Sequence, residues 1–204
     1  MELQLQNIGM IKEATVKIDG LTVIAGENDT GKSTVGKGLL TILKSSSEDG
    51  NITSYILKNI FKDINFLRNG HFKLTTDKKS EFWISISDQG NINTGKNNLQ
   101  DFPPRENIFI ETPLVWNFSD FFRDIAQIES QMRIKLDYPY LMKDLNFKLH
   151  IKSASDGVDI KKQMTELMGG EFKKDEMGRY YFEKDGEKIE LVNTATGIKT
   201  FGIF

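Results

Sequence analysis

The sequence predicts an α/β fold, and three observations lead to this prediction. A glycine-rich loop at residues 26–34 lies between a short apolar run and a segment with apolar residues at helical spacing. Two segments ahead of this loop alternate apolar and polar residues, as half-buried strands do. Further along the chain, helical and strand-like patterns both recur, so the chain combines the two kinds of element.

The glycine-rich loop matches the phosphate-binding pattern G-x-x-x-x-G-K-[ST], a P-loop. Its residues are Gly26, Glu27, Asn28, Asp29, Thr30, Gly31, Lys32, Ser33 and Thr34. Leu21–Ala25 before it is predicted as a buried strand, and the apolar residues from Val35 to Leu43 predict a helix after it. Because a chance glycine loop would lack this context, we interpret residues 26–34 as the cofactor-binding loop of a P-loop NTPase.

The residue types in this loop indicate how it would bind a polyphosphate and Mg²⁺. Gly26 and Gly31 allow a tight turn in which successive backbone N–H groups point inward. The following helix offers further free N–H groups and the positive end of its dipole. We expect Lys32 to reach the β- and γ-phosphates as a catalytic residue, and the Ser33 hydroxyl to bind the metal.

Asp29 stands where a common version of this loop has glycine. Asp tolerates a left-handed backbone better than most residues do, so the turn is expected to form. A carboxylate beside phosphates lowers affinity, and we assign Asp29 no role of its own.

Composition limits the classes of function. The chain has 204 residues, a formal net charge of −2, no cysteine and two histidines far apart, His71 and His150. These features argue against disulfides, thiolate chemistry and a zinc site, and the charge gives no support for nucleic-acid binding. No apolar run is long enough to span a membrane, and the first residues lack the pattern of a signal peptide, so we expect a cytoplasmic protein.

The first half of the chain predicts several elements in order. Leu3–Leu5 and Ala14–Ile18 alternate as strands, and Asp19-Gly20 is a turn signal, so Leu21–Ala25 would be the third strand. An amphipathic helix is predicted from Ile52 to Leu67, ended by Asn69-Gly70. The remaining predictions are a hairpin over 72–86, a surface loop over 89–105 and a buried strand, Ile108–Ile110.

The second half predicts helices and then a hairpin. Apolar residues at helical spacing follow Trp116, and two further helices are predicted over 141–149 and 160–168. Asp185-Gly186 predicts a hairpin turn, and Thr194 or Thr196 is the predicted N-cap of a last helix. Because the pattern stops on exposed apolar residues, we expect an N-terminal piece of a longer protein. The paired lysines 161–162 and 173–174 are interpreted as solvated faces, with a DNA track as the alternative.

The two ends of the chain together resemble the ABC-class ATPases, in particular their SMC-, RecF- and OLD-like branch. The stretch IKEATVKIDGLTVIAGENDTGKST is similar to the opening of that branch, and NTATGIKTFGIF resembles its signature motif. The resemblance covers the two ends well and the middle only in layout. It implies one ATPase head, with residues 1–115 as the nucleotide-binding lobe and 116–204 as helical insertion, hairpin and signature-like motif.

The resemblance also implies a homodimer in which two heads enclose ATP. Gly197 matches the signature glycine, whose N–H would face the γ-phosphate held by the other head, so Gly197 is a second candidate catalytic residue. The signature serine falls on Ala195 or Thr196, and the glutamine of the family falls on Glu111 or Thr112. The family's second acidic motif, an apolar strand ending in Asp-Glu, is expected after the signature helix, and this sequence ends before it. An effector domain or chain is a further implied partner.

Three alternatives remain open. Glu111 after Ile108–Ile110 would make the chain a self-contained P-loop NTPase. A nucleotide-sensing module without catalysis would present Gly197 and the 201–204 segment to a partner. A small-molecule kinase shares the loop, but the strands ahead of the loop argue against it. The guanine-specificity pattern N-K-x-D is absent from the sequence, which argues against a GTPase.

Overall fold

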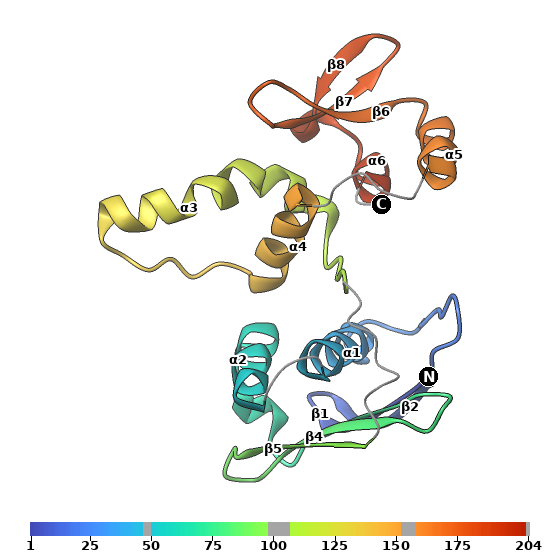
Figure 1. The fold of residues 1–204 in the computed structure, drawn as a ribbon, viewed down its shortest axis with the longest axis vertical. Helices are drawn as coiled ribbons and strands as arrows, with labels where there is room; N and C mark the ends of the chain where they lie inside the picture. Colours follow the sequence, from blue (N-terminus) through green and yellow to red (C-terminus); the bar gives the residue numbers. More distant parts are fainter. Residues whose placement is uncertain (47–49, 98–106, 152–157, 203–204) are drawn as a thin grey trace. The chain divides into compact units, whose positions relative to one another are not determined.

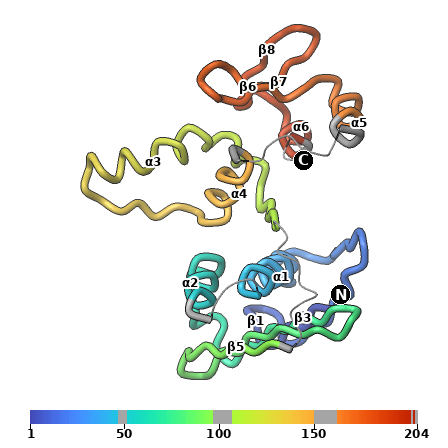
Figure 2. Tube along the Cα trace, in the orientation of Figure 1, coloured from blue at the N-terminus to red at the C-terminus, as the bar shows by residue number. Residues whose placement is uncertain are grey.

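A computed structural model describes residues 1–46, 50–97, 107–151 and 158–202 of the chain. The structure is mixed α/β and divides into two compact units, residues 1–109 and 110–204, which Figures 1 and 2 trace from blue to red. Each unit has its own sheet and its own helices, so each is described separately below.

The first unit is built on a five-stranded antiparallel sheet. Its strands are β1 (Glu2–Ile8), β2 (Ile11–Lys17), β3 (His71–Thr75), β4 (Glu81–Ile86) and β5 (Ile92–Asn97). The order across the sheet is β2-β1-β3-β4-β5, which makes β2 and β5 the edge strands. The predicted β1, β2 and hairpin β3–β4 are confirmed. The predicted loop over 89–105 is wrong over β5, which pairs with β4 from Ile92 opposite Ile86 to Asn97 opposite Glu81; residues 98–105 lie outside the described part.

Two helices cover one face of this sheet, α1 (Lys32–Ser46) and α2 (Gly50–Phe61) (Figure 1). Gly38 lets α1 approach β1 closely, because a Cβ at Gly38 would lie 3.0 Å from Leu5 Cδ2. The core between helices and sheet is formed by buried aliphatic and aromatic side chains, among them Leu3, Leu5, Ile42, Leu57, Phe72, Leu74 and Ile84. This packing anchors α1, the helix that follows the glycine loop.

The helix predicted from Ile52 to Leu67 ends earlier, at Phe61. Lys62 adopts a left-handed backbone, with φ of 64°, which terminates α2. Asp63 then caps a short 3₁₀ helix, Ile64–Leu67, by accepting a hydrogen bond from the Asn65 backbone N–H at 2.8 Å. The apolar periodicity therefore continues through two helical pieces rather than one.

Two predicted strands are wrong. Leu21–Ala25 is not a strand, and Leu21 and Val23 are 91% and 78% exposed. Ile108–Ile110 also lacks strand structure. A strand forms only where a neighbouring strand completes its backbone hydrogen bonds, and none of the described strands pairs with either segment. The apolar residues of these segments favour a strand, but neither segment has a neighbouring strand among the described residues.

The second unit begins with helices. A 3₁₀ helix, Pro113–Phe118, is capped by Thr112, whose hydroxyl accepts from the Leu114 backbone N–H at 3.2 Å. It leads into α3 (Ser119–Met132), followed by α4 (Tyr140–Ile151) and α5 (Val158–Met168). These three helices confirm the prediction from helical spacing.

A three-stranded antiparallel sheet follows, with strands β6 (Glu171–Lys174), β7 (Tyr180–Lys184) and β8 (Glu187–Glu190) in that order. The predicted β7–β8 hairpin is confirmed, and its turn residues Asp185 and Gly186 are both left-handed. Strand β6 was not predicted from the sequence. A last short helix, α6 (Thr196–Phe201), has Ala195 as its N-cap, so the prediction of Thr194 or Thr196 is wrong. The Thr194 hydroxyl instead donates to the Glu190 carbonyl at 3.1 Å.

Trp116 lies at the centre of the second unit. Its ring stacks on Phe172 at 5.6 Å and meets Tyr180 edge-on at 4.9 Å, between ring centroids. Its indole N–H donates to the Lys199 carbonyl at 2.9 Å, and the Lys199 ammonium donates to the Asn117 amide oxygen at 3.1 Å. These contacts hold the 3₁₀ helix, the sheet and α6 together.

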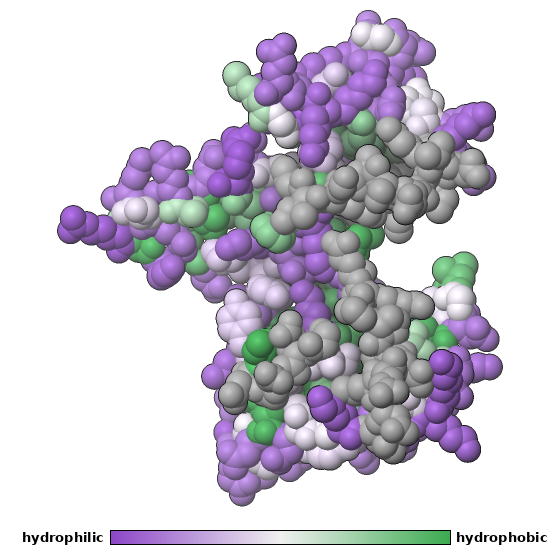
Figure 3. All heavy atoms as spheres, viewed as in Figure 1, coloured by the Kyte–Doolittle hydropathy of each residue, from purple (hydrophilic) through white to green (hydrophobic). Residues whose placement is uncertain are grey.

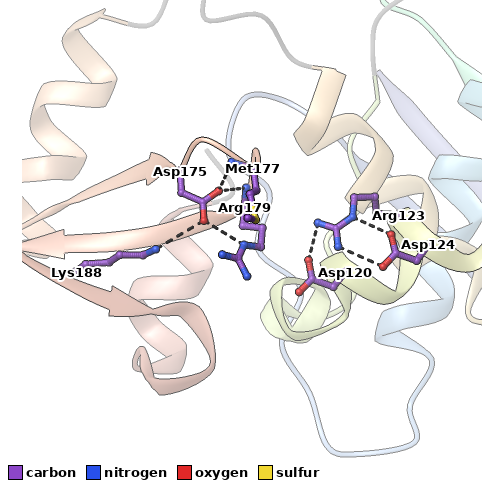
Figure 4. Close-up of polar contacts among 7 residues, drawn as sticks. All are labelled: Asp120, Arg123, Asp124, Asp175, Met177, Arg179 and Lys188. Atoms are coloured by element: carbon purple, nitrogen blue, oxygen red, sulfur yellow. Dashed lines mark hydrogen bonds and ion pairs between the residues drawn. The ribbon is translucent and has the colours of Figure 1, made fainter.

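Figure 4 shows two polar clusters on this unit. Asp175 accepts hydrogen bonds from the backbone N–H groups of Met177 and Arg179 and pairs with the Arg179 and Lys188 side chains. On α3, Arg123 lies between Asp120 and Asp124. The cluster around Asp175 stabilises the β6–β7 turn, whereas the cluster around Arg123 joins only residues of α3 to one another.

Side chains on the face seen in Figure 3 are largely hydrophilic, with smaller apolar areas between them. Among the described residues, no helix has the length and apolar character needed to cross a bilayer.

Candidate nucleotide-binding site

The glycine loop joins residues 21–25, which have no regular secondary structure, to the first turn of α1. Residues 26–30 are exposed, and α1 begins at Lys32. Asp29 is left-handed, with φ of 62°, as expected for a residue at a position where glycine is common. The loop thus keeps its turn although its middle residue carries a carboxylate.

Gly31 is required by both its backbone and its surroundings. Its φ of 89° is a conformation that L side chains rarely adopt. A Cβ at this position would also lie 2.8 Å from Ile11 Cγ1 in β2. The loop therefore rests directly on the edge strand of the sheet, and only glycine fits this contact.

Lys32 folds back over the loop. Its ammonium donates to the Gly26 carbonyl at 2.9 Å and also to the Glu27 carbonyl, and the Thr30 hydroxyl donates to the same Glu27 carbonyl at 2.8 Å. An ammonium group has three N–H donors. Among the described residues, two of these donors bind loop carbonyls, so the third N–H remains for a ligand. The positive charge of Lys32 is thereby held over the loop, beside the residues that line the cavity described below.

The start of α1 supplies further donors. The Val35 backbone N–H donates to the Gly31 carbonyl at 3.0 Å, which closes the first turn. The N–H groups of Lys32, Ser33 and Thr34 precede this bond and have no intrahelical acceptor. No acidic residue lies in the first turn of α1 to compensate the dipole. Together these groups can satisfy several oxygens of an anion.

A cavity of about 500 Å³ opens beside the loop. This volume lies within the range of small-molecule sites, roughly 300 to 1,000 Å³. One wall is the loop itself and the other is the tip and edge of the β1–β2 hairpin. The lining residues are Met10, Ile11, Lys12, Glu13, Ala14, Ile24, Ala25, Gly26, Thr30, Gly31, Lys32 and Val35.

Ser33 is the residue that suits a metal. It is exposed in the first turn of α1, next to the ammonium-bearing Lys32. Mg²⁺ usually keeps several waters and takes few protein ligands besides phosphate oxygens, so one hydroxyl fits such an ion. Within the described residues, no three His, Cys, Asp or Glu side chains gather into a site that would hold a metal without a phosphate.

The other predicted site residues belong to the second unit. Gly197 lies exposed in the first turn of α6, and a Cβ added there would meet no atom within 4 Å. Ala195 and Thr196 beside it are exposed as well. Glu111 is also a residue of this unit, and Ile203 and Phe204 lie outside the described residues.

No sequence pattern predicts the hairpin wall of the cavity. Met10–Ala14 reads as the start of an ordinary edge strand, with no motif of its own. Its role follows from the packing of Ile11 on Gly31, a contact between residues 20 positions apart in the chain. The one local signal is Gly9, left-handed at φ of 57°, which turns the chain tightly and so puts Met10 at the hairpin tip.

Comparisons of the chain with protein-family models, with curated proteins and with solved structures found no match.

Proposed function

We propose that this chain is an ATP-binding module whose glycine loop and α1 bind the nucleotide's phosphates together with Mg²⁺. The observation that carries the proposal is the arrangement of Lys32. Its ammonium is held over the loop by the carbonyls of Gly26 and Glu27, beside a cavity of nucleotide-compatible volume. A positive charge, free helix N–H groups and a glycine turn in one place are the features that a polyphosphate requires.

Each loop residue has a defined part in this proposal. The backbone N–H groups of Lys32, Ser33 and Thr34 would donate to phosphate oxygens, while Lys32 would neutralise charge on the outer phosphates. Ser33 would supply the protein ligand for Mg²⁺. The bound metal would stabilise negative charge on the phosphates. If phosphate is transferred to water, Lys32 would also stabilise charge that develops in the transition state.

The resemblance to ABC-class heads extends this proposal to assembly. We propose a cytoplasmic P-loop NTPase head in which the exposed Gly197 of one copy meets the nucleotide bound to another copy. The support is the open space above Gly197, flanked by the small residues Ala195 and Thr196. ATP would then join two heads, and its hydrolysis would separate them. An effector domain or chain would respond to this cycle.

A second candidate function is nucleotide sensing without turnover. Among the cavity-lining residues, Glu13 is the one side chain with a carboxylate. General-base activation of water needs such a group within hydrogen-bond reach of the attacking water, so binding without turnover is expected if Glu13 does not come within that reach. A self-contained NTPase that uses Glu111 would instead hydrolyse ATP, and Glu111→Gln would abolish that hydrolysis.

Calorimetry with ATP and Mg²⁺, combined with light scattering for mass, tests these proposals. Micromolar binding with a doubling of mass supports both the loop site and the two-head assembly. Binding without a change of mass retains the loop site and overturns the assembly of copies of this chain. Absence of binding overturns the function. A parallel phosphate-release assay separates the ATPase from the sensing module.

A further inference from the structure

We propose that the apolar part of the cavity is a nucleobase site formed by Met10 and Ile24, an inference that rests on the proposed ATP-binding function. The base would lie against these two side chains while the phosphates occupy the glycine loop.

The chemistry of the lining divides the cavity into two parts. Gly26, Thr30, Gly31 and Lys32 offer N–H, hydroxyl and ammonium donors to phosphates. Half of the lining residues carry only apolar side chains: Met10, Ile11, Ala14, Ile24, Ala25 and Val35. Such side chains cannot satisfy a phosphate, but they suit a flat heteroaromatic ring with an apolar face.

Met10 and Ile24 are the two lining residues with large apolar side chains that are exposed. Met10 is 65% exposed and Ile24 is 43% exposed, whereas Ile11 and Val35 are buried. A ligand that covers Met10 and Ile24 gains the free energy of removing their apolar surface from water. The Met10 thioether adds a favourable contact with an aromatic ring.

The segment before the loop provides an internal comparison. Ile24 lines the cavity, while the neighbouring Val23 does not, although Val23 is even more exposed at 78%. Apolar exposure alone therefore does not identify the site, because the more exposed Val23 lies outside the cavity lining.

This arrangement predicts which nucleotides bind best. A contact made by apolar packing strengthens with the area of the ring, so a purine covers more of Met10 and Ile24 than a pyrimidine does. We expect ATP to bind more tightly than CTP. We expect tripolyphosphate, which has no base, to bind through the loop alone and more weakly than either nucleotide.

Calorimetry of the full chain with Mg²⁺ and ATP, CTP or tripolyphosphate tests the inference. Met10→Ala and Ile24→Ala should each weaken ATP binding by about tenfold, the effect of about two methylene groups returned to water. Both variants should leave the affinity for tripolyphosphate unchanged. The matched controls are Met177→Ala and Val23→Ala, since these exposed apolar residues do not line the cavity, and they should bind all three ligands as wild type does.

The ligand series separates the two levels of the proposal. If wild type binds ATP no more tightly than tripolyphosphate, the base site is overturned while the phosphate loop stands. The same holds if Met10→Ala and Ile24→Ala, folded as judged by circular dichroism, bind ATP normally. If neither ATP nor tripolyphosphate binds to wild type, the ATP-binding function fails and the base site fails with it.

Discussion

Ile11 packs directly against Gly31, so that a Cβ added to Gly31 would lie 2.8 Å from Ile11 Cγ1. This contact joins the edge strand β2 to the glycine loop. Both residues line the cavity. Their contact therefore lies where the donor-rich part of the cavity meets its hairpin wall. The conformation of the loop therefore depends on the sheet as well as on the loop's own sequence.

Gly31→Ala should remove most nucleotide binding. The new methyl group meets Ile11, and the left-handed backbone at φ of 89° adds strain, on the order of 1–3 kcal/mol. We expect ATP affinity to fall at least about tenfold, because 1.4 kcal/mol corresponds to a factor of ten. Calorimetry with Mg²⁺ measures the change.

Gly90→Ala is the matched control for this substitution. Gly90 has a similar φ of 83°, but a Cβ there would meet nothing within 4 Å. It should lower stability slightly and leave ATP affinity intact. Equal loss of binding in both variants would contradict the specific role assigned to Gly31.

Asp29→Asn should strengthen ATP binding. Asn tolerates the left-handed backbone of position 29, at φ of 62°, as well as Asp does, so the substitution removes the charge and keeps the turn. Asp29 is exposed, and two unit charges 4 Å apart in bulk water repel by about 1 kcal/mol, which predicts about fivefold tighter binding. The gain should shrink in high salt, and an affinity that does not rise in low salt would show that the carboxylate points away from the phosphates.

Trp116→Phe should destabilise the second unit. Phe keeps an aromatic ring for Phe172 but loses the indole donor to the Lys199 carbonyl. A buried acceptor left without its donor costs about 1–3 kcal/mol. Denaturant unfolding followed by circular dichroism would detect this loss, and an unchanged unfolding free energy would mean that the hydrogen bond contributes nothing to the unit.

Asp175 should make stability depend on acid pH. The hydrogen bond from the Arg179 backbone N–H is the main cause that lowers the pKa of this carboxyl; burial opposes it, and the Arg179 side chain adds to the lowering. A carboxyl whose pKa is lower in the folded state stabilises the fold above its unfolded pKa, and that contribution is lost as pH falls through the folded pKa.

Asp175→Asn tests this dependence directly. The variant should be less stable than wild type at pH 7, and the difference should narrow as the pH is lowered below about 4, the ordinary range of an aspartate pKa. Thermal unfolding of both proteins across this range provides the measurement. A difference that stays constant with pH would exclude a role for the charge of Asp175.

Local signals predicted those parts of the fold that depend on neighbouring residues. The helix after the loop, the β7–β8 turn at Asp185-Gly186 and the left-handed Asp29 all follow from short-range chemistry. Leu21–Ala25 has residue types that are typical of a strand but forms none. A strand also needs a neighbouring strand to pair with, and that strand comes from residues far away in the chain. Strand β5 was missed since its Asn- and Gly-containing sequence looks like a loop.

The candidate site was likewise predicted only where it depends on neighbouring residues in the sequence. The motif predicted the donor residues Gly26, Gly31 and Lys32 from their spacing. The hairpin wall could not be predicted, because Met10–Ala14 carries no motif and reaches the loop only through the packing of Ile11. The exposure of Met10 and Ile24, on which the proposed base site depends, is likewise a property of the folded unit.

The most direct test of the ATP-binding account is calorimetry of wild type and Lys32→Ala with ATP and Mg²⁺. Lys32→Ala removes the ammonium that bridges the Gly26 and Glu27 carbonyls and that would, in our proposal, face the phosphates. The account predicts micromolar binding by wild type and no measurable binding by the variant, with both proteins folded by circular dichroism. Equal ATP affinity of the two proteins would contradict it and show that nucleotide, if it binds, does so elsewhere.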